Sequence, residues 1–146
     1  MDMGYNTIFT GKLLFDGEQP ISVVRKINSL AGEDCRDHPE WKADDLFYID
    51  FRVTKDMDGI EWDDGTEKTY DAEKLVNVII RLVREDHPSF ALKGELVAQG
   101  EEYDDRWRLV IGEDGWAHRV EFPRIGQRVT CPNCEEEFTL EETATQ

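Results

Sequence analysis

Two amphipathic helices set among alternating strands constrain the fold of this chain more than any other feature. Apolar residues recur at helical spacing after Pro20 and again after Asp71. The first stripe is Ile21, Val23, Val24, Ile27, Leu30 and Ala31, and the second is Leu75, Val76, Ile79, Leu82 and Val83. Pro20 suits the first helical position, Asp71 suits an N-cap, and His87-Pro88 ends the second helix. Each helix has one apolar face to bury, so both are expected to pack on one sheet.

Alternation of apolar and polar residues predicts strands in much of the remaining chain. They are expected at about residues 5–15, 46–53, 60–62, 90–99, 106–111 and 116–122. Phe9, Leu13 and Phe15 share one face of the first strand, and Phe47, Ile49, Phe51 and Val53 share one face of the second. Asp58-Gly59 and Asp64-Gly65 indicate turns.

The resulting order, β-α-β-β-α-β-β-β, predicts an α+β domain over residues 1–122. Two helices are expected on one face of an antiparallel or mixed sheet. The first six elements follow the ferredoxin-like β-α-β-β-α-β order, and the last strands extend the sheet as a meander. Residues 123–146 are expected to form a linker, a small zinc-knuckle appendage and a disordered tail.

The strongly acidic composition limits the partners that this chain can bind. Its 146 residues carry 33 Asp and Glu against 17 Lys and Arg, a formal net charge of −16. Such a charge repels phosphate backbones, so direct binding to nucleic acid is disfavoured and a basic protein surface is favoured. No apolar run is long enough for a membrane span, and the N-terminus lacks the pattern of a signal peptide. Three cysteines do not make a disulfide framework, so a reducing cytoplasm is the expected location.

Acidic residues concentrate between Glu33 and Glu73, where the chain has 15 Asp and Glu but only five Lys and Arg. Within this stretch the candidate partner-binding residues are Asp56, Asp58, Glu61, Trp62, Asp63, Asp64 and Glu67. They are expected on a projecting hairpin, with the carboxylates imitating a phosphate track and Trp62 serving as an exposed anchor. The alternative is a solvated hairpin that only keeps the protein soluble.

The sequence Cys131-Pro132-Asn133-Cys134 is typical of a zinc knuckle, since two thiolates at this spacing on a tight turn face one metal ion. Cys35 and His38 have the same spacing. The four side chains together predict a closed, structural Cys₃His zinc site that joins the two ends of the chain. The alternative is that a second molecule supplies the missing ligands, which would make the protein a homodimer.

Motifs of enzymatic catalysis are missing from the sequence. His38, His87 and His118 have no nucleophile beside them in a recognisable pattern, and there is no Gly-rich phosphate loop and no Gly-x-Ser-x-Gly. The sequence therefore predicts a binding protein without enzymatic activity.

Two short motifs flank the second helix. Glu67-Lys68-Thr69-Tyr70-Asp71 precedes it, and Gly94-Glu95-Leu96-Val97-Ala98-Gln99-Gly100-Glu101 follows it. With these motifs, about residues 5–122 resemble a loosely defined group of small acidic proteins of phages, prophages and bacteria. The resemblance implies a phage-encoded protein in the host cytoplasm, but no activity is established for the group and no functional residue is implied. The C-terminal Cys-Pro-Asn-Cys resembles zinc-ribbon knuckles.

Charge and resemblance together favour one function and leave one alternative. The favoured function is inhibition or modulation of a host nucleic-acid-handling protein, in the manner of a DNA mimic that occupies a basic surface. The alternative is a zinc-stabilised adaptor or scaffold that binds its partner through apolar and aromatic contacts.

Overall fold

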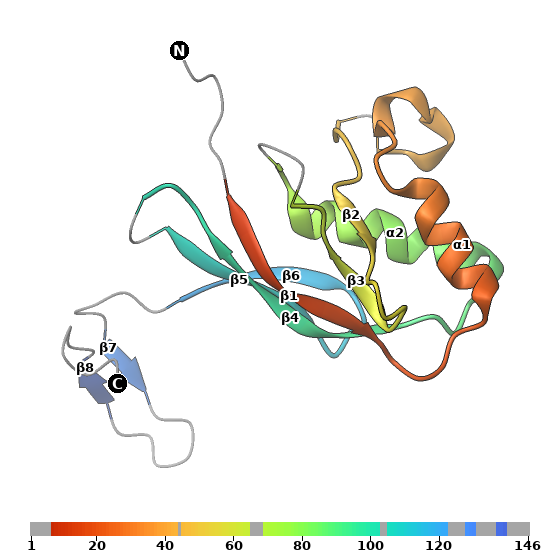
Figure 1. The fold of residues 1–146 in the computed structure, drawn as a ribbon. Coiled ribbons are helices and arrows are strands. Elements are labelled where there is room, and N and C mark those ends of the chain that lie inside the picture. Colours follow the sequence, from red (N-terminus) through yellow and green to blue (C-terminus); the bar gives the residue numbers. More distant parts are fainter. Residues whose placement is uncertain are drawn as a thin grey trace.

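The computed structural model describes residues 7–43, 45–64, 69–102 and 105–122, together with two short strands at 128–130 and 137–139. Its first elements are β1 (Ile8–Phe15), α1 (Ile21–Leu30), two 3-10 helices (Cys35–Asp37 and Pro39–Trp41), β2 (Phe51–Val53) and β3 (Gly59–Trp62). They are followed by α2 (Ala72–Asp86), β4 (Leu92–Gln99), β5 (Arg106–Ile111), β6 (Ala117–Glu121), β7 (Arg128–Thr130) and β8 (Glu137–Thr139) (Figure 1).

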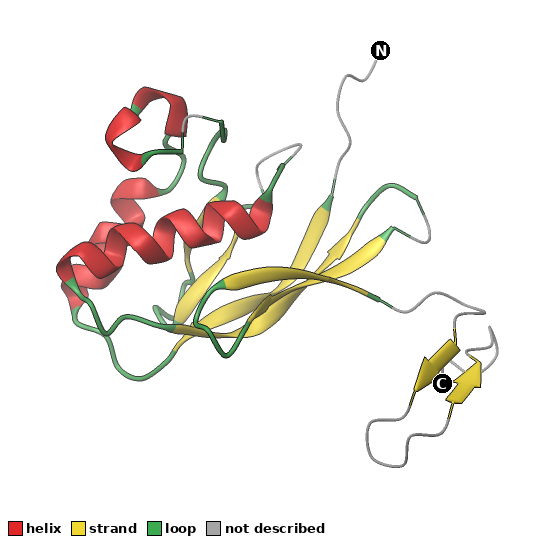
Figure 2. Cartoon of the chain, turned by 180° about the vertical axis from the view of Figure 1, so that it is seen from behind, coloured by secondary structure: helices red, strands yellow, loops and turns green. Residues whose placement is uncertain are grey.

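Six strands form one sheet in the order β2-β3-β1-β4-β5-β6, and every neighbouring pair is antiparallel. Both helices pack against this sheet (Figure 2). The predicted α+β architecture, with two helices on an antiparallel sheet, is therefore confirmed. β7 and β8 pair with each other in a separate two-stranded sheet.

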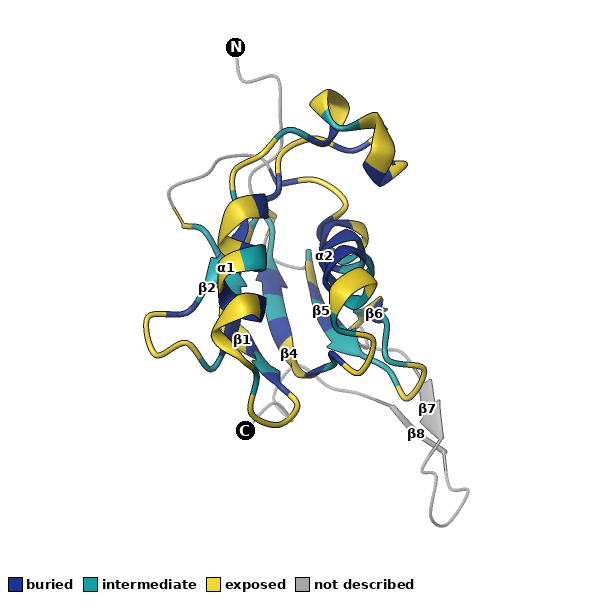
Figure 3. Cartoon of the chain, turned by 90° about the vertical axis from the view of Figure 1, so that its right-hand side faces the viewer, coloured by how far each residue is buried: buried dark blue, intermediate teal, exposed yellow. Residues whose placement is uncertain are grey.

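The core lies between the helices and one face of the sheet. Every member of the predicted second helical stripe is buried, as are Val23, Val24, Ile27 and Leu30 of α1. The strands contribute Phe9, Leu13, Phe51, Ile60, Leu96 and Leu109 from the same face (Figure 3). Most of their neighbours in sequence point the other way and are exposed or half-buried, whereas Asp50 and Gly59 are buried. The sheet thus has one covered face and one open face, as antiparallel sheets commonly do.

β2 is shorter than the alternation of residues 46–53 predicts. Tyr48 forms an isolated bridge with Asp34, and the Ile49 N–H donates to the Glu33 carbonyl oxygen at 2.9 Å. Tyr48 and Ile49 therefore pair with the loop after α1, and β2 begins only at Phe51. Phe47 is 44% exposed, so the prediction that it faces inward is wrong, whereas Ile49 and Phe51 are buried as predicted.

One turn prediction and one helix-cap prediction also need correction. The β2–β3 connection turns at Thr54–Asp58, and Gly59 already belongs to β3 instead of closing the turn. Asp71 stands at the N-cap of α2 with a left-handed backbone (φ 54°), and its side chain makes no capping hydrogen bond. The Asp71 carbonyl oxygen instead accepts from the Lys74 and Leu75 N–H groups.

No helix among the described residues is both long and apolar enough for a membrane span.

Candidate interaction surfaces

An acidic edge runs along the β2–β3 hairpin and consists of Asp56, Asp58, Glu61, Asp63 and Asp64. Its centre is Arg52, which lies opposite Glu61 across the β2–β3 pair. The Arg52 guanidinium contacts three carboxylates, those of Glu61 at 3.1 Å, Asp63 at 3.3 Å and Asp64 at 3.5 Å. One positive charge therefore lies among three negative charges, and the cluster remains negative.

Asp58 is fixed by contacts outside the hairpin strands. Its carboxylate accepts a hydrogen bond from Lys12 of β1 at 2.7 Å and another from the Thr54 hydroxyl at 2.6 Å. The hydrogen bond from Lys12, followed by that from Thr54, lowers the pKa of Asp58. The side chain therefore stays ionised and anchors the turn, so it is a structural part of the acidic edge.

Trp62 differs from the exposed anchor that the sequence suggested. The side chain is half-buried and packs against Phe9, with ring centroids 5.5 Å apart. Its Nε1–H donates to the Thr69 hydroxyl at 2.8 Å, and that hydroxyl donates to Asp50 at 2.9 Å. Burial raises the pKa of Asp50. A part in partner binding stays a prediction for Trp62, and also for Glu67, which lies outside the described residues.

The predicted zinc ligands Cys35 and His38 are close in sequence but lie in different environments. The Cys35 side chain is fully buried, and this burial raises the pKa of its thiol to about 11. His38 contacts Glu33 at 3.1 Å and Glu40 at 3.2 Å with its two ring nitrogens and stacks on Trp41. The hydrogen bond to Glu33 is the main cause that raises the pKa of His38.

The other two predicted ligands, Cys131 and Cys134, lie outside the described residues. In the described part of the chain, no group of three or more His, Cys, Asp or Glu side chains is placed to hold a metal ion. The predicted four-ligand site therefore stays a prediction. Its intrachain form requires the Cys35 thiol to bind the metal as a thiolate.

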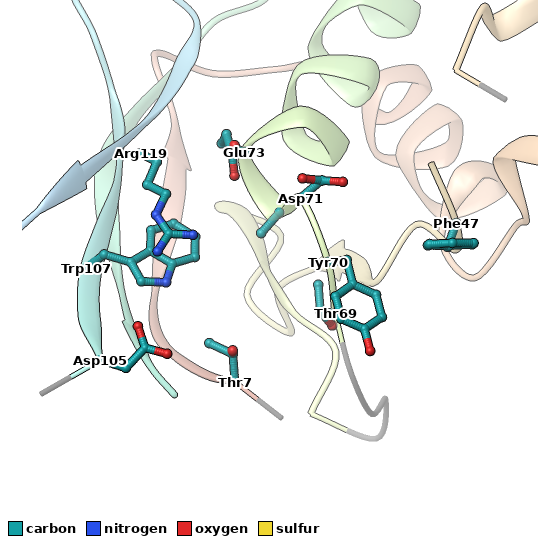
Figure 4. Close-up of a pocket in the computed structure, with 10 residues that line it drawn as sticks. Thr7, Phe47, Thr69, Tyr70, Asp71, Glu73, Asp105, Trp107 and Arg119 are labelled. Carbon is teal, nitrogen blue, oxygen red and sulfur yellow. The ribbon is translucent and has the colours of Figure 1, made fainter. Parts of the chain in front are cut away.

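A pocket of about 490 Å³ lies beside the N-terminus of α2 and was not foreseen from the sequence (Figure 4). Its lining residues come from five separate stretches of chain: Thr7, Phe47, Thr69, Tyr70, Asp71, Ala72, Glu73, Asp105, Trp107 and Arg119. The Arg119 guanidinium lies 4.3 Å from the Trp107 ring centroid and pairs with Glu121 at 2.8 Å. Because the chain's own arginine covers that ring, we assign the pocket no ligand.

An aromatic patch borders this pocket and consists of Phe47, Tyr48, Tyr70 and Arg36. Its three rings are 41–50% exposed, and Phe47 meets Tyr70 edge-on with centroids 6.1 Å apart. Arg36 lies 4.8 Å from the Phe47 ring centroid and 5.8 Å from that of Tyr48. The patch was not predicted from the sequence, because Phe47 was assigned to the core.

Searches of the chain against protein-family models, curated proteins and solved structures found no match.

Proposed function

We propose that the protein is a non-enzymatic acidic binding protein that occupies a basic surface of a nucleic-acid-handling protein. In this proposal it is phage-encoded, acts in the host cytoplasm and inhibits or modulates its target as a DNA mimic. The net charge of −16 supports a basic partner and disfavours a nucleic acid.

The observation that carries the proposal is the ordered arrangement of the acidic edge. A solubilising face needs only charge, whereas Glu61, Asp63 and Asp64 converge on Arg52 and Asp58 is held by Lys12. Fixed carboxylates lose less side-chain entropy on binding than freely rotating ones, and their negative field attracts a basic partner during encounter.

A ferredoxin-like core is the scaffold that we propose for this edge. It is supported by the strand order β2-β3-β1-β4, in which each helix links two strands that have one antiparallel strand between them. In that arrangement β2 lies at the margin of the sheet, so the hairpin is accessible to a partner.

The test is capture from host lysate followed by quantitative binding of the identified protein. The variant Asp56→Asn/Glu61→Gln/Asp63→Asn/Asp64→Asn removes four charges but leaves Asp58 on Lys12 and Thr54. We expect the partner's dissociation constant at low salt to rise at least about tenfold, because charge pairs at an interface are lost. Raising the salt concentration should weaken binding of the unaltered protein more than binding of the variant.

A matched control removes the same four charges elsewhere. Glu18→Gln/Glu85→Gln/Asp86→Asn/Glu113→Gln changes exposed residues outside the acidic edge. It should leave the affinity within about twofold, as expected for charges remote from an interface. Equal losses in the two variants would show that total charge alone matters and would refute the acidic edge as the recognition surface.

The aromatic patch favours the alternative function, an adaptor that docks through apolar and aromatic contacts. Tyrosine and arginine are enriched among residues that dominate interface energetics, and Phe47, Tyr48 and Tyr70 are exposed beside Arg36. If the captured partner loses affinity with Tyr48→Ala/Tyr70→Ala but is insensitive to salt and to the acidic-edge variant, the adaptor is the better description.

We also propose that the C-terminal Cys131 and Cys134 bind a structural zinc ion. The donor set fits zinc, and β7 and β8 on either side of this stretch pair in antiparallel register, as the arms of a knuckle would. Protein purified without chelator should contain zinc, and Cys131→Ser/Cys134→Ser should abolish it in elemental analysis. If the Cys35→Ser variant keeps the same zinc content, the intrachain Cys₃His site is excluded and ligands from a second molecule are favoured.

A further inference from the structure

The open face of the sheet carries several apolar side chains in addition to its polar and charged ones. Six apolar side chains point away from the helices on the four strands β1, β4, β5 and β6 or directly after them. They are Ile8, Leu14, Val97, Val110, Val120 and Phe122, all exposed or half-buried. Ile8 is 59% exposed. We call these six side chains the apolar band. Polar and charged residues of the same strands alternate with them, and the described part of the chain leaves them uncovered.

This face has an acidic end and a basic end, with the exposed side chains of Lys12, Lys93 and Glu95 on the strands between them. One end is the acidic edge on β2–β3, where Glu61 and Asp63 surround Arg52. The other end, on β5, carries Arg106 and Arg108, whose guanidinium groups lie 4.8 and 5.6 Å from the Phe122 ring centroid. We call these two arginines the basic end. Arg108 also contacts Glu95 of the neighbouring strand at 3.4 Å.

Strand order fixes how these two ends are related. The acidic edge is at one margin of the sheet and β5–β6 is at the other, with β1 and β4 between them. When two such faces meet across a two-fold axis parallel to the strands, β2 and β3 of each copy lie over β6 and β5 of the other. The acidic edge then meets the basic end twice, and the apolar bands meet in the middle. A two-fold axis perpendicular to the strands would instead oppose like charges.

We propose that the open sheet face is a self-association surface that binds a second copy of this chain about a two-fold axis parallel to the strands. Two-fold contacts are the commonest in homo-oligomers because one surface serves both copies. Charge complementarity selects a second copy as the occupant. A nucleic acid would have to approach a chain of net charge −16, and a basic partner would oppose Arg106 and Arg108.

The size of the face sets the strength that we expect. Six strands about 4.8 Å apart, four of them about 20 Å long and β2 and β3 roughly half that, give a footprint that buries on the order of 1,000 Å² in the pair. This is at the small end of specific interfaces, so a reversible dimer with a dissociation constant of about 10 μM is expected. The excess negative charge outside the face opposes dimerisation, and salt at about 0.15 M screens much of that repulsion.

The test is sedimentation of the full chain between about 1 and 200 μM, a range that brackets the expected constant. EDTA is present, so that zinc shared between copies contributes nothing. One variant, Arg106→Glu/Arg108→Glu, makes both ends acidic, and a second, Glu61→Lys/Asp63→Lys/Asp64→Lys, makes both ends basic. Each alone should be monomeric, because like charges then face each other. Mixed in equal amounts, they should form a heterodimer, because both contacts are then restored.

A control and a fold check complete the experiment. Arg25→Glu/Lys74→Glu makes the same change in net charge as the first variant, but on the helices, and it should still dimerise. Near-ultraviolet circular dichroism verifies that each variant is folded. A monomeric unaltered chain at every concentration, or variants that fail to combine on mixing, would overturn the proposal. If the unaltered chain is monomeric, the open face is instead available to residues 123–146 or to a different protein.

The dimer does not depend on the proposed function, because it is measured on the protein alone. Glu61 and Asp63 belong to both surfaces, so a basic partner bound at the acidic edge and a second copy would exclude each other.

Discussion

Phe51→Ala should lower the free energy of unfolding by about 3–5 kcal/mol, the usual cost of truncating a fully buried phenylalanine. Phe51 has no exposed surface and lies at the start of β2, edge-on to Phe9 with ring centroids 6.3 Å apart. β2 is only three residues long, so few neighbouring contacts can close around the cavity. Chemical denaturation, followed by fluorescence and circular dichroism, measures the loss.

The matched control is the same substitution four residues earlier. Phe47 is 44% exposed, so Phe47→Ala should change the free energy of unfolding by less than about 1 kcal/mol. Equal losses for the two variants would mean that residues 46–53 form one continuous strand with both rings in the core. That result would support the prediction from the alternating sequence pattern, in which Phe47 faces inward, and would contradict the structure.

Phe47 and Phe51 also show where sequence periodicity succeeds and where it stops. Alternation identified β1, β4, β5 and β6, and helical spacing identified α1 and α2, because each is long enough to bury one continuous face. It failed at residues 46–50, whose hydrogen-bond partners lie in the loop after α1. Periodicity reports which side chains share a face and carries no information on which backbone groups pair.

The same limit applies to the candidate surfaces. The carboxylates of the acidic edge were identified from local composition, but Lys12 comes from β1, 46 residues away from Asp58, and only tertiary structure brings it there. Trp62 was assigned an exposed role from its acidic neighbours in sequence, and Cys35 was assigned a ligand role from its spacing to His38. Their actual neighbours are Phe9 and the core, and a single sequence gives no signal for such long-range contacts.

Gly59→Ala should be the other strongly destabilising substitution, costing about 3 kcal/mol through overpacking against the backbone. Gly59 begins β3 and lies opposite Leu14 of β1. A Cβ at this position would overlap the Leu13 carbonyl oxygen and come within 2.9 Å of the Leu14 Cα. No side-chain rotation relieves an overlap with backbone atoms, so β1 and β3 must move apart. Because Asp58 precedes Gly59 and pairs with Lys12 of β1, that movement should also separate this ion pair.

Gly112→Ala is the matched control, since neither glycine needs a positive φ. A Cβ at Gly112 would lie 2.9 Å from Asp114 Oδ1 and 3.0 Å from His118 Cδ2. Both atoms belong to exposed side chains, whose rotation breaks only the exposed Asp114–His118 pair and the hydrogen bond from the Trp116 N–H, so the expected loss is about 1 kcal/mol. For a chain of this length, 3 kcal/mol corresponds to a fall of roughly 6–12 °C in the midpoint of thermal unfolding. Equal midpoints for Gly59→Ala and Gly112→Ala would refute the close β1–β3 approach and, with it, the position of the acidic edge.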